Sequence, residues 1–309
     1  MVLPITGLPK TCYRNTTAFY IQTRQFMAKD LIYKIEGLKC AYRSANSEAR
    51  TVLEIGSLQI PKNKMVFVLG RSGVGKSTIL EALGLMNNTI VSGSDVQFTP
   101  TAQERYDFSG IWEAAKKDAL SKVRNNHFSF IFQETNLMPN FTVYENICFT
   151  QMLQGVTYRQ ALDKVKQAMK DVGLSGIEEH KKVYELSGGQ KQRVAFVRAI
   201  TPRFTVLFGD EPTGNLDENN ATELMSMLRE NILNNGRTAV IVSHDINLAL
   251  RFADTLILIS KDNDMGVVQP GHIYESRITE KGNTNWHNHR GIIEEETLKN
   301  TIRNIIRQN

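Results

Sequence analysis

Short runs of apolar residues recur along the chain, and segments with helical periodicity lie between most of them. The first run, residues 31–42 (LIYKIEGLKCAY), alternates apolar and polar positions, as a half-buried antiparallel strand does. Later runs are shorter and almost entirely apolar; they cover residues 65–69, 128–132, 205–209, 239–242 and 255–259. Buried strands that alternate with helices are typical of a mainly parallel sheet covered on both faces. The pattern predicts an α/β fold that begins with an antiparallel part.

Two longer segments have the spacing of amphipathic helices. Residues 110–124 (GIWEAAKKDALSKVR) mix apolar and charged positions. Residues 157–174 carry apolar side chains at helical intervals, namely Ala161, Val165, Ala168, Met169 and Val172. This second segment lies within about residues 134–202, where several helical patterns occur and no strong strand does. We expect a helical subdomain there, inserted into the α/β core.

The two ends of the chain differ from the middle. Residues 1–28 show no clear periodicity and are basic, so we expect a loosely ordered extension before a domain at residues 29–270. Residues 271–309 are mostly polar until a helix candidate at 294–308. An apolar stripe runs along this candidate, formed by Leu298, Ile302, Ile305 and Ile306. We expect the stripe to pack on the body of the protein; a helix lying on a membrane surface is the alternative.

Composition places the chain among globular proteins. Its 309 residues are 41% hydrophobic and 22% charged, which is enough apolar material for a sizeable core and excludes wholesale disorder. The net charge of +5 is small for this length, so it does not indicate a protein that tracks nucleic-acid phosphates. No apolar stretch approaches 18 residues, so we expect any membrane role to come through a partner.

Cysteine usage argues against a disulfide scaffold or a zinc module. The three cysteines, Cys12, Cys40 and Cys148, are scattered, and no CxxC pair is present. A reducing, cytosolic environment is the simplest interpretation, and the first residues lack the pattern of a secretory signal. The H-x-H pair His287 and His289 lies in a polar segment, where solvated histidines are commoner than metal ligands.

The strongest single motif is a glycine-rich loop between a strand and a helix. GRSGVGKST fits G-x-x-x-x-G-K-[ST], a pattern whose backbone N–H groups and helix N-terminus surround phosphates. The lysine can reach the β- and γ-phosphates, and the hydroxyl after it can bind Mg²⁺. A simple glycine turn is the other interpretation, but strand, loop and helix stand in the order that phosphate binding needs. The predicted nucleotide-binding residues here are Gly70, Arg71, Ser72, Gly73, Val74, Gly75, Lys76, Ser77 and Thr78.

Two adjacent acids follow a later apolar strand. Asp210 directly follows the run at residues 205–209, so we expect it at the carboxyl edge of the predicted sheet. There it can hold Mg²⁺ through water. Glu211 can act as general base toward the water that attacks the γ-phosphate. An isolated Asp-Glu pair is usually a surface feature, but the phosphate loop upstream favours the functional interpretation.

A further pentapeptide, LSGGQ, precedes a helical pattern. Ser187 is a good helix cap, and Gly188 and Gly189 allow an anion to approach the backbone closely. With the other motifs, this pentapeptide identifies a resemblance to the nucleotide-binding subunits of ATP-binding-cassette (ABC) transporters, across about residues 31–270. LSGGQ resembles the family signature; the other matches are GRSGVGKST to Walker A, VLFGDE to Walker B, Asn215-Leu216-Asp217 to the D-loop, His244 in IVSHD to the switch histidine and Gln133 in FIFQETNLMP to the Q-loop.

The resemblance implies a P-loop NTPase fold of the ABC ATPase type and a cofactor set of ATP and Mg²⁺. Two subunits would sandwich two ATP molecules head to tail, so we expect a second copy of this chain, or a related ATPase, as partner. The catalytic residues would be Glu211, His244, Gln133 and Lys76. The partner's nucleotide would meet Ser187, Gly188, Gly189, Gln190 and Asp217. The Mg²⁺ ligands would be Ser77, Gln133 and Asp210. Tyr42 would stack on adenine, with Tyr33 as its rival.

Two strings narrow the resemblance within the family. FQETNLMPNFTVYENI and DEPTGNLD are similar to the branch of lipoprotein-release, macrolide-export and cell-division ATPases. The resemblance therefore implies an ATP-hydrolysing subunit at the cytoplasmic face of the membrane, driving an integral membrane permease, with no direct nucleic-acid partner. A soluble ABC ATPase acting on ribosomes or nucleic acid is the alternative, and a catalytically silent scaffold is a third. The segment of 57 positions from Lys76 to Gln133 is longer than this branch leads us to expect.

Overall fold

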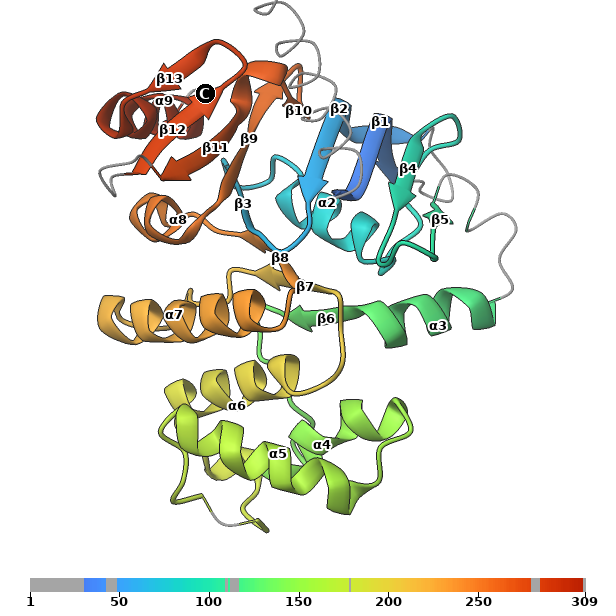
Figure 1. Ribbon diagram of the computed structural model, residues 1–309, viewed down its shortest axis with the longest axis vertical. Coiled ribbons are helices and arrows are strands. Elements are labelled where there is room, and N and C mark those ends of the chain that lie inside the picture. The colour runs from blue at the N-terminus through green and yellow to red at the C-terminus, as the bar shows by residue number, and fades with distance from the viewer. Residues whose placement is uncertain are drawn as a thin grey trace, which may run out of the picture.

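The computed structural model describes residues 31–42, 49–108, 111, 117–177, 179–278 and 284–307. The expectations for residues 1–28 and for Cys12 lie outside this range. The predicted fold class is confirmed: an antiparallel part leads into a mostly parallel core with a helical insert (Figure 1).

The antiparallel part begins with the alternating segment. β1 (Leu31–Tyr42) pairs with β2 (Arg50–Pro61), and β1 also pairs with β4 (Asp95–Phe98), which carries the short β5 (Tyr106–Asp107). Buried positions alternate along β1 because successive side chains of a strand point to opposite faces. The apolar alternation of the sequence therefore predicted this strand correctly.

The parallel core consists of the short apolar runs. Its strands lie side by side in the order β9 (Thr255–Asp262), β3 (Met65–Gly70), β8 (Thr238–Val242), β7 (Val206–Asp210) and β6 (Phe128–Ile131). β10 (Met265–Val268) joins this core to the antiparallel part, because it pairs with both β9 and β2. All carboxyl ends of the parallel strands meet at one edge of the sheet, where ligands of such sheets bind.

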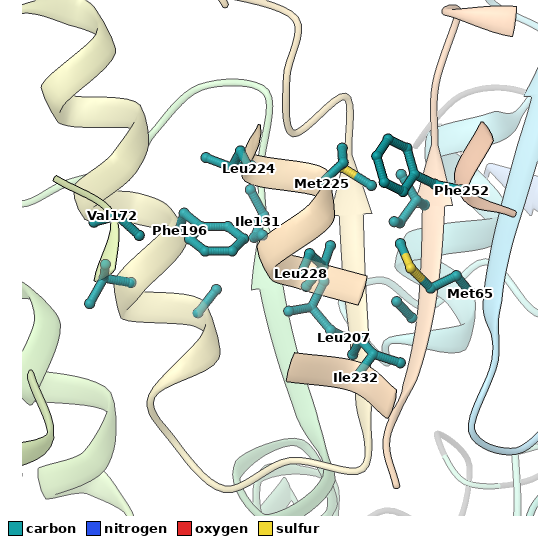
Figure 2. Close-up of a cluster of buried hydrophobic side chains, with 14 of the residues drawn as sticks. Met65, Ile131, Val172, Phe196, Leu207, Leu224, Met225, Leu228, Ile232 and Phe252 are labelled. Atoms are coloured by element: carbon teal, nitrogen blue, oxygen red, sulfur yellow. The ribbon is translucent and has the colours of Figure 1, made fainter. Parts of the chain in front are cut away.

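Helices cover both faces of the core. On one face, α7 (Glu218–Asn234) places Leu224, Met225 and Leu228 over buried strand residues (Figure 2). α8 (Ile246–Phe252) lies on the same side. The other face is covered by α2 (Lys76–Leu83) and α3 (Lys117–His127), and the described part of α3 starts later than the predicted 110–124 and extends further.

A helical subdomain lies beyond β6 and β7, within the segment where we expected it (Figure 1). It contains α4 (Val143–Leu153), α5 (Tyr158–Asp171), the turn η1 (Val183–Glu185) and α6 (Gly188–Ile200). Capping boxes start α4 and α5: Thr142 pairs with Glu145, and Thr157 with Gln160. None of the described helices is both long and apolar enough to cross a membrane.

The C-terminal part differs from the sequence expectation of a polar tail followed by one helix. After η2 (Pro270–His272), three strands form: β11 (Ile273–Ile278), β12 (Thr284–Asn288) and β13 (Gly291–Ile293). They were missed because the strands are short and mix polar with apolar residues, and β11 is held by pairing with β9. The expected helix is present as α9 (Glu295–Arg307).

The apolar stripe of α9 packs on the body of the protein. Leu298 and Ile302 are 0% exposed and belong to the same hydrophobic cluster as the core strands and α8. The helix contacts β3, β9 and β12. The sequence expectation for the stripe is therefore confirmed.

We predict that Leu298→Ala lowers the free energy of unfolding by about 2–5 kcal/mol, because it removes a fully buried side chain and leaves a cavity. Asn304→Ala on the exposed side of the same helix is the matched control and should change stability by less than about 0.5 kcal/mol. Urea unfolding of both variants checks this. Equal stabilities would mean that α9 is not packed as described.

Candidate functional site

The glycine-rich loop connects β3 to α2 at the carboxyl edge of the sheet. Gly73 and Gly75 have φ of 76° and 99°, a left-handed backbone that glycine adopts without strain. Gly75 caps α2 with no side-chain hydrogen bond, so the first N–H groups of the helix are offered to a ligand. The loop therefore has the backbone shape that an anion site requires.

Lys76 is the most enclosed charged residue of this loop. It is 8% exposed, and its Nζ donates to the carbonyls of Gly70 and Arg71, both at 2.9 Å. Burial lowers the pKa of Lys76, while the carboxylates of Glu211 and Asp210 act in the opposite direction. The lysine, the loop and the two acids therefore form one electrostatic unit.

The two acids stand where β7 ends. The backbone of Glu211 is left-handed, with φ of 47°, which costs a non-glycine residue about 1–3 kcal/mol. Hydrogen bonds hold it there, from Glu211 N to the Val242 carbonyl at 3.0 Å and from Gly214 N to the Glu211 carbonyl at 3.1 Å. This geometry brings Oε2 of Glu211 to 3.0 Å from Nδ1 of His244. Both residues line a cavity of about 320 Å³.

Gln133 follows β6 at the same edge. Its backbone carbonyl accepts from Asn215 at 3.5 Å, which links the two segments that resemble the Q-loop and the D-loop. The residues after Gln133 are held by Arg198 of α6, whose guanidinium donates to the carbonyls of Thr135 and Asn136 at 2.7 Å. Sequence reasoning did not single out Arg198, because a basic residue in a helix is usually solvated.

The LSGGQ segment begins α6 in the helical subdomain, away from the glycine-rich loop (Figure 1). Ser187 caps the helix: Gln190 N donates to Ser187 Oγ at 3.3 Å, and Ser187 N donates to Gln190 Oε1 at 3.0 Å. Ser187 and Gly188 are exposed, so the start of α6 is open to a second molecule. The capping predicted for Ser187 is therefore present.

A buried side chain of α6 ties this region to the segment that follows the acids. Gln192 of α6 is buried and donates to the Pro212 carbonyl, directly after Glu211. Asp217 caps α7 by accepting from Asn220 N at 3.0 Å, and that backbone hydrogen bond is the main cause that lowers the pKa of Asp217. Motion of α6 would therefore reach the loop that carries Glu211.

The chain is similar to known proteins in sequence and fold. A profile described as "ABC transporter" matches residues 53–214, which is more than half of the chain. The chain belongs to the ABC transporter family. The lipoprotein-releasing system ATP-binding protein LolD of Nitratidesulfovibrio vulgaris is 34% identical over 218 residues, 71% of this chain and 88% of LolD. The macrolide export ATP-binding/permease protein MacB of Vibrio parahaemolyticus is 33% identical over 76% of this chain, which spans only 34% of MacB.

Solved structures of the family share the fold. The dimeric ATP-binding cassette MJ0796, in a post-hydrolysis state bound to ADP and Pi, has a TM-score of 0.65 and 28% identity, covering 77% of this chain and 96% of that one. The present chain is thus the ATP-binding, ATP-hydrolysing part of an ABC transporter, as the motifs predicted. LolD and MacB proteins are among the relatives to which it is similar.

The sequence offers two candidate tyrosines, Tyr42 and Tyr33, for stacking on adenine. Tyr42 is 47% exposed at the end of β1, and its hydroxyl lies 3.3 Å from Thr78 Oγ1 beside the loop. Tyr33 is 0% exposed, stacks on Phe98 and donates to the Leu83 carbonyl, so it is a core residue. The structure therefore removes Tyr33 as a candidate and leaves Tyr42 available.

Sequence reasoning also missed a residue that shapes the cassette's phosphate loop. Gly266 of β10 lies against Val74: a Cβ at this position would stand 2.0 Å from the Val74 carbonyl oxygen. A glycine inside a strand often marks such a close backbone approach, and this was the available signal.

His287 lies in β12, and His289 follows that strand and accepts a hydrogen bond from Arg290.

Proposed function

We propose that two copies of this chain, or this chain and a related ATPase, bind two ATP molecules head to tail. The observation that carries the proposal is the Glu211–His244 pair at 3.0 Å, at the strand edge that also holds the phosphate loop. The exposed start of α6 supports the dimer. In Figure 1, α6 lies away from α2, which begins at the phosphate loop of the same chain, and Ser187 and Gly188 at the start of α6 are exposed. The dimeric state of the cassette MJ0796 is a further support.

Each catalytic residue has a distinct part in this proposal. Lys76 holds the phosphates, and Glu211 accepts the proton of the attacking water. His244 orients Glu211 and contacts the γ-phosphate, so the developing charge is surrounded by donors. Across the dimer, Ser187, Gly188 and Gly189 supply donors to the partner's nucleotide, and Asp217 contacts the partner's loop. Gln190 supports them by fixing Ser187 in its capping box.

Mg²⁺ fits the residues at this edge. The Ser77 hydroxyl, the Asp210 carboxylate and the Gln133 amide are hard oxygen donors of the kind that Mg²⁺ prefers, and they would hold it. The bound ion would neutralise charge on the phosphates during transfer. Gln133 also starts the segment anchored by Arg198, so it can report the state of the nucleotide to the helical subdomain.

Tyr42 is proposed to stack on adenine. We predict that Tyr42→Ala raises the Kd for ATP about fivefold to a hundredfold, because stacking on a base contributes roughly 1–3 kcal/mol. Tyr42→Phe keeps the ring and should bind ATP nearly as the natural protein does. Equilibrium titration with a fluorescent ATP analogue measures both. Equal affinities of the alanine and natural proteins would exclude Tyr42 from the adenine site.

We further propose that the chain works on an integral membrane permease, from the cytoplasmic face, with residues 29–270 as the ATPase domain and 271–309 as an appended segment. Likeness to LolD, an ATP-binding protein of a lipoprotein-releasing system, favours this over a ribosomal or nucleic-acid partner. Affinity purification of the Glu211→Gln protein with ATP from detergent-solubilised membranes tests it. Recovery of a polytopic membrane protein is expected; recovery of ribosomes or nucleic acid would overturn the transporter role and leave the ATPase intact.

A further inference from the structure

A cavity of about 590 Å³ lies in the C-terminal part of the chain, away from the phosphate loop. Its lining residues come from η2, from the turn between β12 and β13, and from α9. Strands β12 and β13 and helix α9 lie at the upper left of Figure 1. It falls outside residues 53–214, the stretch that matches the family profile. Cavities of roughly 300–1,000 Å³ are of the size that encloses small organic molecules.

Polar residues line this cavity, and one of them, His272, carries a nitrogen that is unpaired within the described part of the chain. Nδ1 of His272 is buried and makes no hydrogen bond to any residue that the structure describes. Such a group costs free energy unless a ligand or water satisfies it. Tyr274, Asn288 and Thr301 also line the cavity. The cavity therefore offers directional polar contacts as well as space.

Its wall is already ordered by hydrogen bonds. The Asn288 side chain donates to the Gly271 carbonyl at 3.5 Å and accepts from Arg290 N at 2.9 Å. The His289 ring lies directly over Gly271, where a Cβ would come within 3.0 Å of it, and accepts from Arg290 Nε at 3.3 Å. These contacts fix the β12–β13 turn, so Arg290 is held at the rim with its side chain exposed.

The charged side chain that lines the cavity is positive. The described lining residues include Arg290 and two histidines but no aspartate or glutamate. Burial, and secondarily the charge of Arg290, lowers the pKa of His272, which favours the neutral form of its ring. Pro270, Ile292 and Ile293 supply apolar surface beside these groups.

We propose that this cavity binds a small organic anion. Its oxyanion group contacts Arg290 and His272, and its apolar portion lies against Pro270, Ile292 and Ile293. Arginine suits this role because its planar guanidinium pairs with an oxyanion through two parallel hydrogen bonds. The site is separate from the ATP site, so a negative result for anion binding would leave the proposed ATPase mechanism unaffected.

A fluorine NMR titration tests the proposal with para-trifluoromethylbenzoate as the probe and the full chain as the protein. A non-hydrolysable ATP analogue and Mg²⁺ are present throughout, so that the phosphate loop is occupied. We expect saturable binding of the benzoate and at least about tenfold weaker binding of the neutral para-trifluoromethylbenzamide, which has the same shape. Absence of saturable binding, or equal binding of the amide, would overturn the proposal.

Three variants locate the binding. Arg290→Ala removes an exposed side chain and should weaken the benzoate about tenfold or more. His272→Phe keeps a ring but removes both nitrogens and should also weaken it. Arg277→Ala removes the same charge from β11, outside the cavity lining, and should leave the affinity unchanged. Equal affinity in the Arg290 and Arg277 variants would place the anion elsewhere.

Discussion

Glu211→Gln is expected to lower the steady-state rate of ATP hydrolysis about 10²–10⁴-fold, because glutamine cannot accept the proton of the attacking water. ATP should still bind, since the phosphate loop and Lys76 are unchanged. The bound, unhydrolysed nucleotide should hold two chains together. Phosphate release measures the first effect, and light scattering with Mg²⁺ and ATP measures the mass of the complex.

Glu230→Gln is the matched control for this variant. Glu230 is exposed on α7, and the substitution removes the same charge from the same subunit. It should hydrolyse ATP at the natural rate. Unchanged turnover in Glu211→Gln would remove Glu211 from the role of general base, and a strictly monomeric complex with ATP would argue against the head-to-tail dimer.

Gly266→Ala is expected to have the second largest effect, roughly a hundredfold loss in kcat/KM for ATP. Its Cβ would lie 2.0 Å from the Val74 carbonyl oxygen and 3.0 Å from Ile259 Cγ2, so β10 or the phosphate loop must move. Val74 belongs to that loop, and a displacement of about 1 Å in a catalytic site can cost about 10²-fold in rate. The loss should appear in KM as well as in kcat, because the displaced loop binds phosphate.

Gly56→Ala provides the same substitution without the contact. Gly56 lies in β2, and a Cβ there meets nothing within 4 Å. This variant should keep the natural kcat/KM. Thermal unfolding of both variants separates a shifted loop from a general loss of folding. If Gly266→Ala is folded and fully active, then the loop does not depend on β10.

The close contact at Gly266 also gives the C-terminal part a physical connection to the ATP site. The chain passes from β10 into η2, and η2 forms one wall of the cavity at His272. β11 is paired with β9, which in turn is paired with β3, the strand that enters the phosphate loop. The C-terminal segment is therefore joined by strand pairing to the sheet that carries the phosphate loop.

The sequence by itself determined the parallel core, the membership of an ATPase family and the position of the glycine-rich loop between β3 and α2. This succeeded because buried parallel strands are short apolar runs, and because the loop at residues 70–78 needs particular residue types at fixed spacing. Glu211 and Lys76 could be selected for the same reason. Their signals are local, so neither required knowledge of what packs against them.

Only the tertiary structure decided which of Tyr42 and Tyr33 stands beside the loop, because exposure depends on distant elements and not on strand position. It also decided that β11–β13 form, since each of these short strands is held by backbone pairing with a neighbour: β11 with β9, β12 with β11, and β13 with β12. The contact of Gly266 with Val74 and the cavity around His272 arise from segments that meet only in the folded chain. Close approach and enclosure are properties of the packed molecule, so no reading of residues in order can supply them.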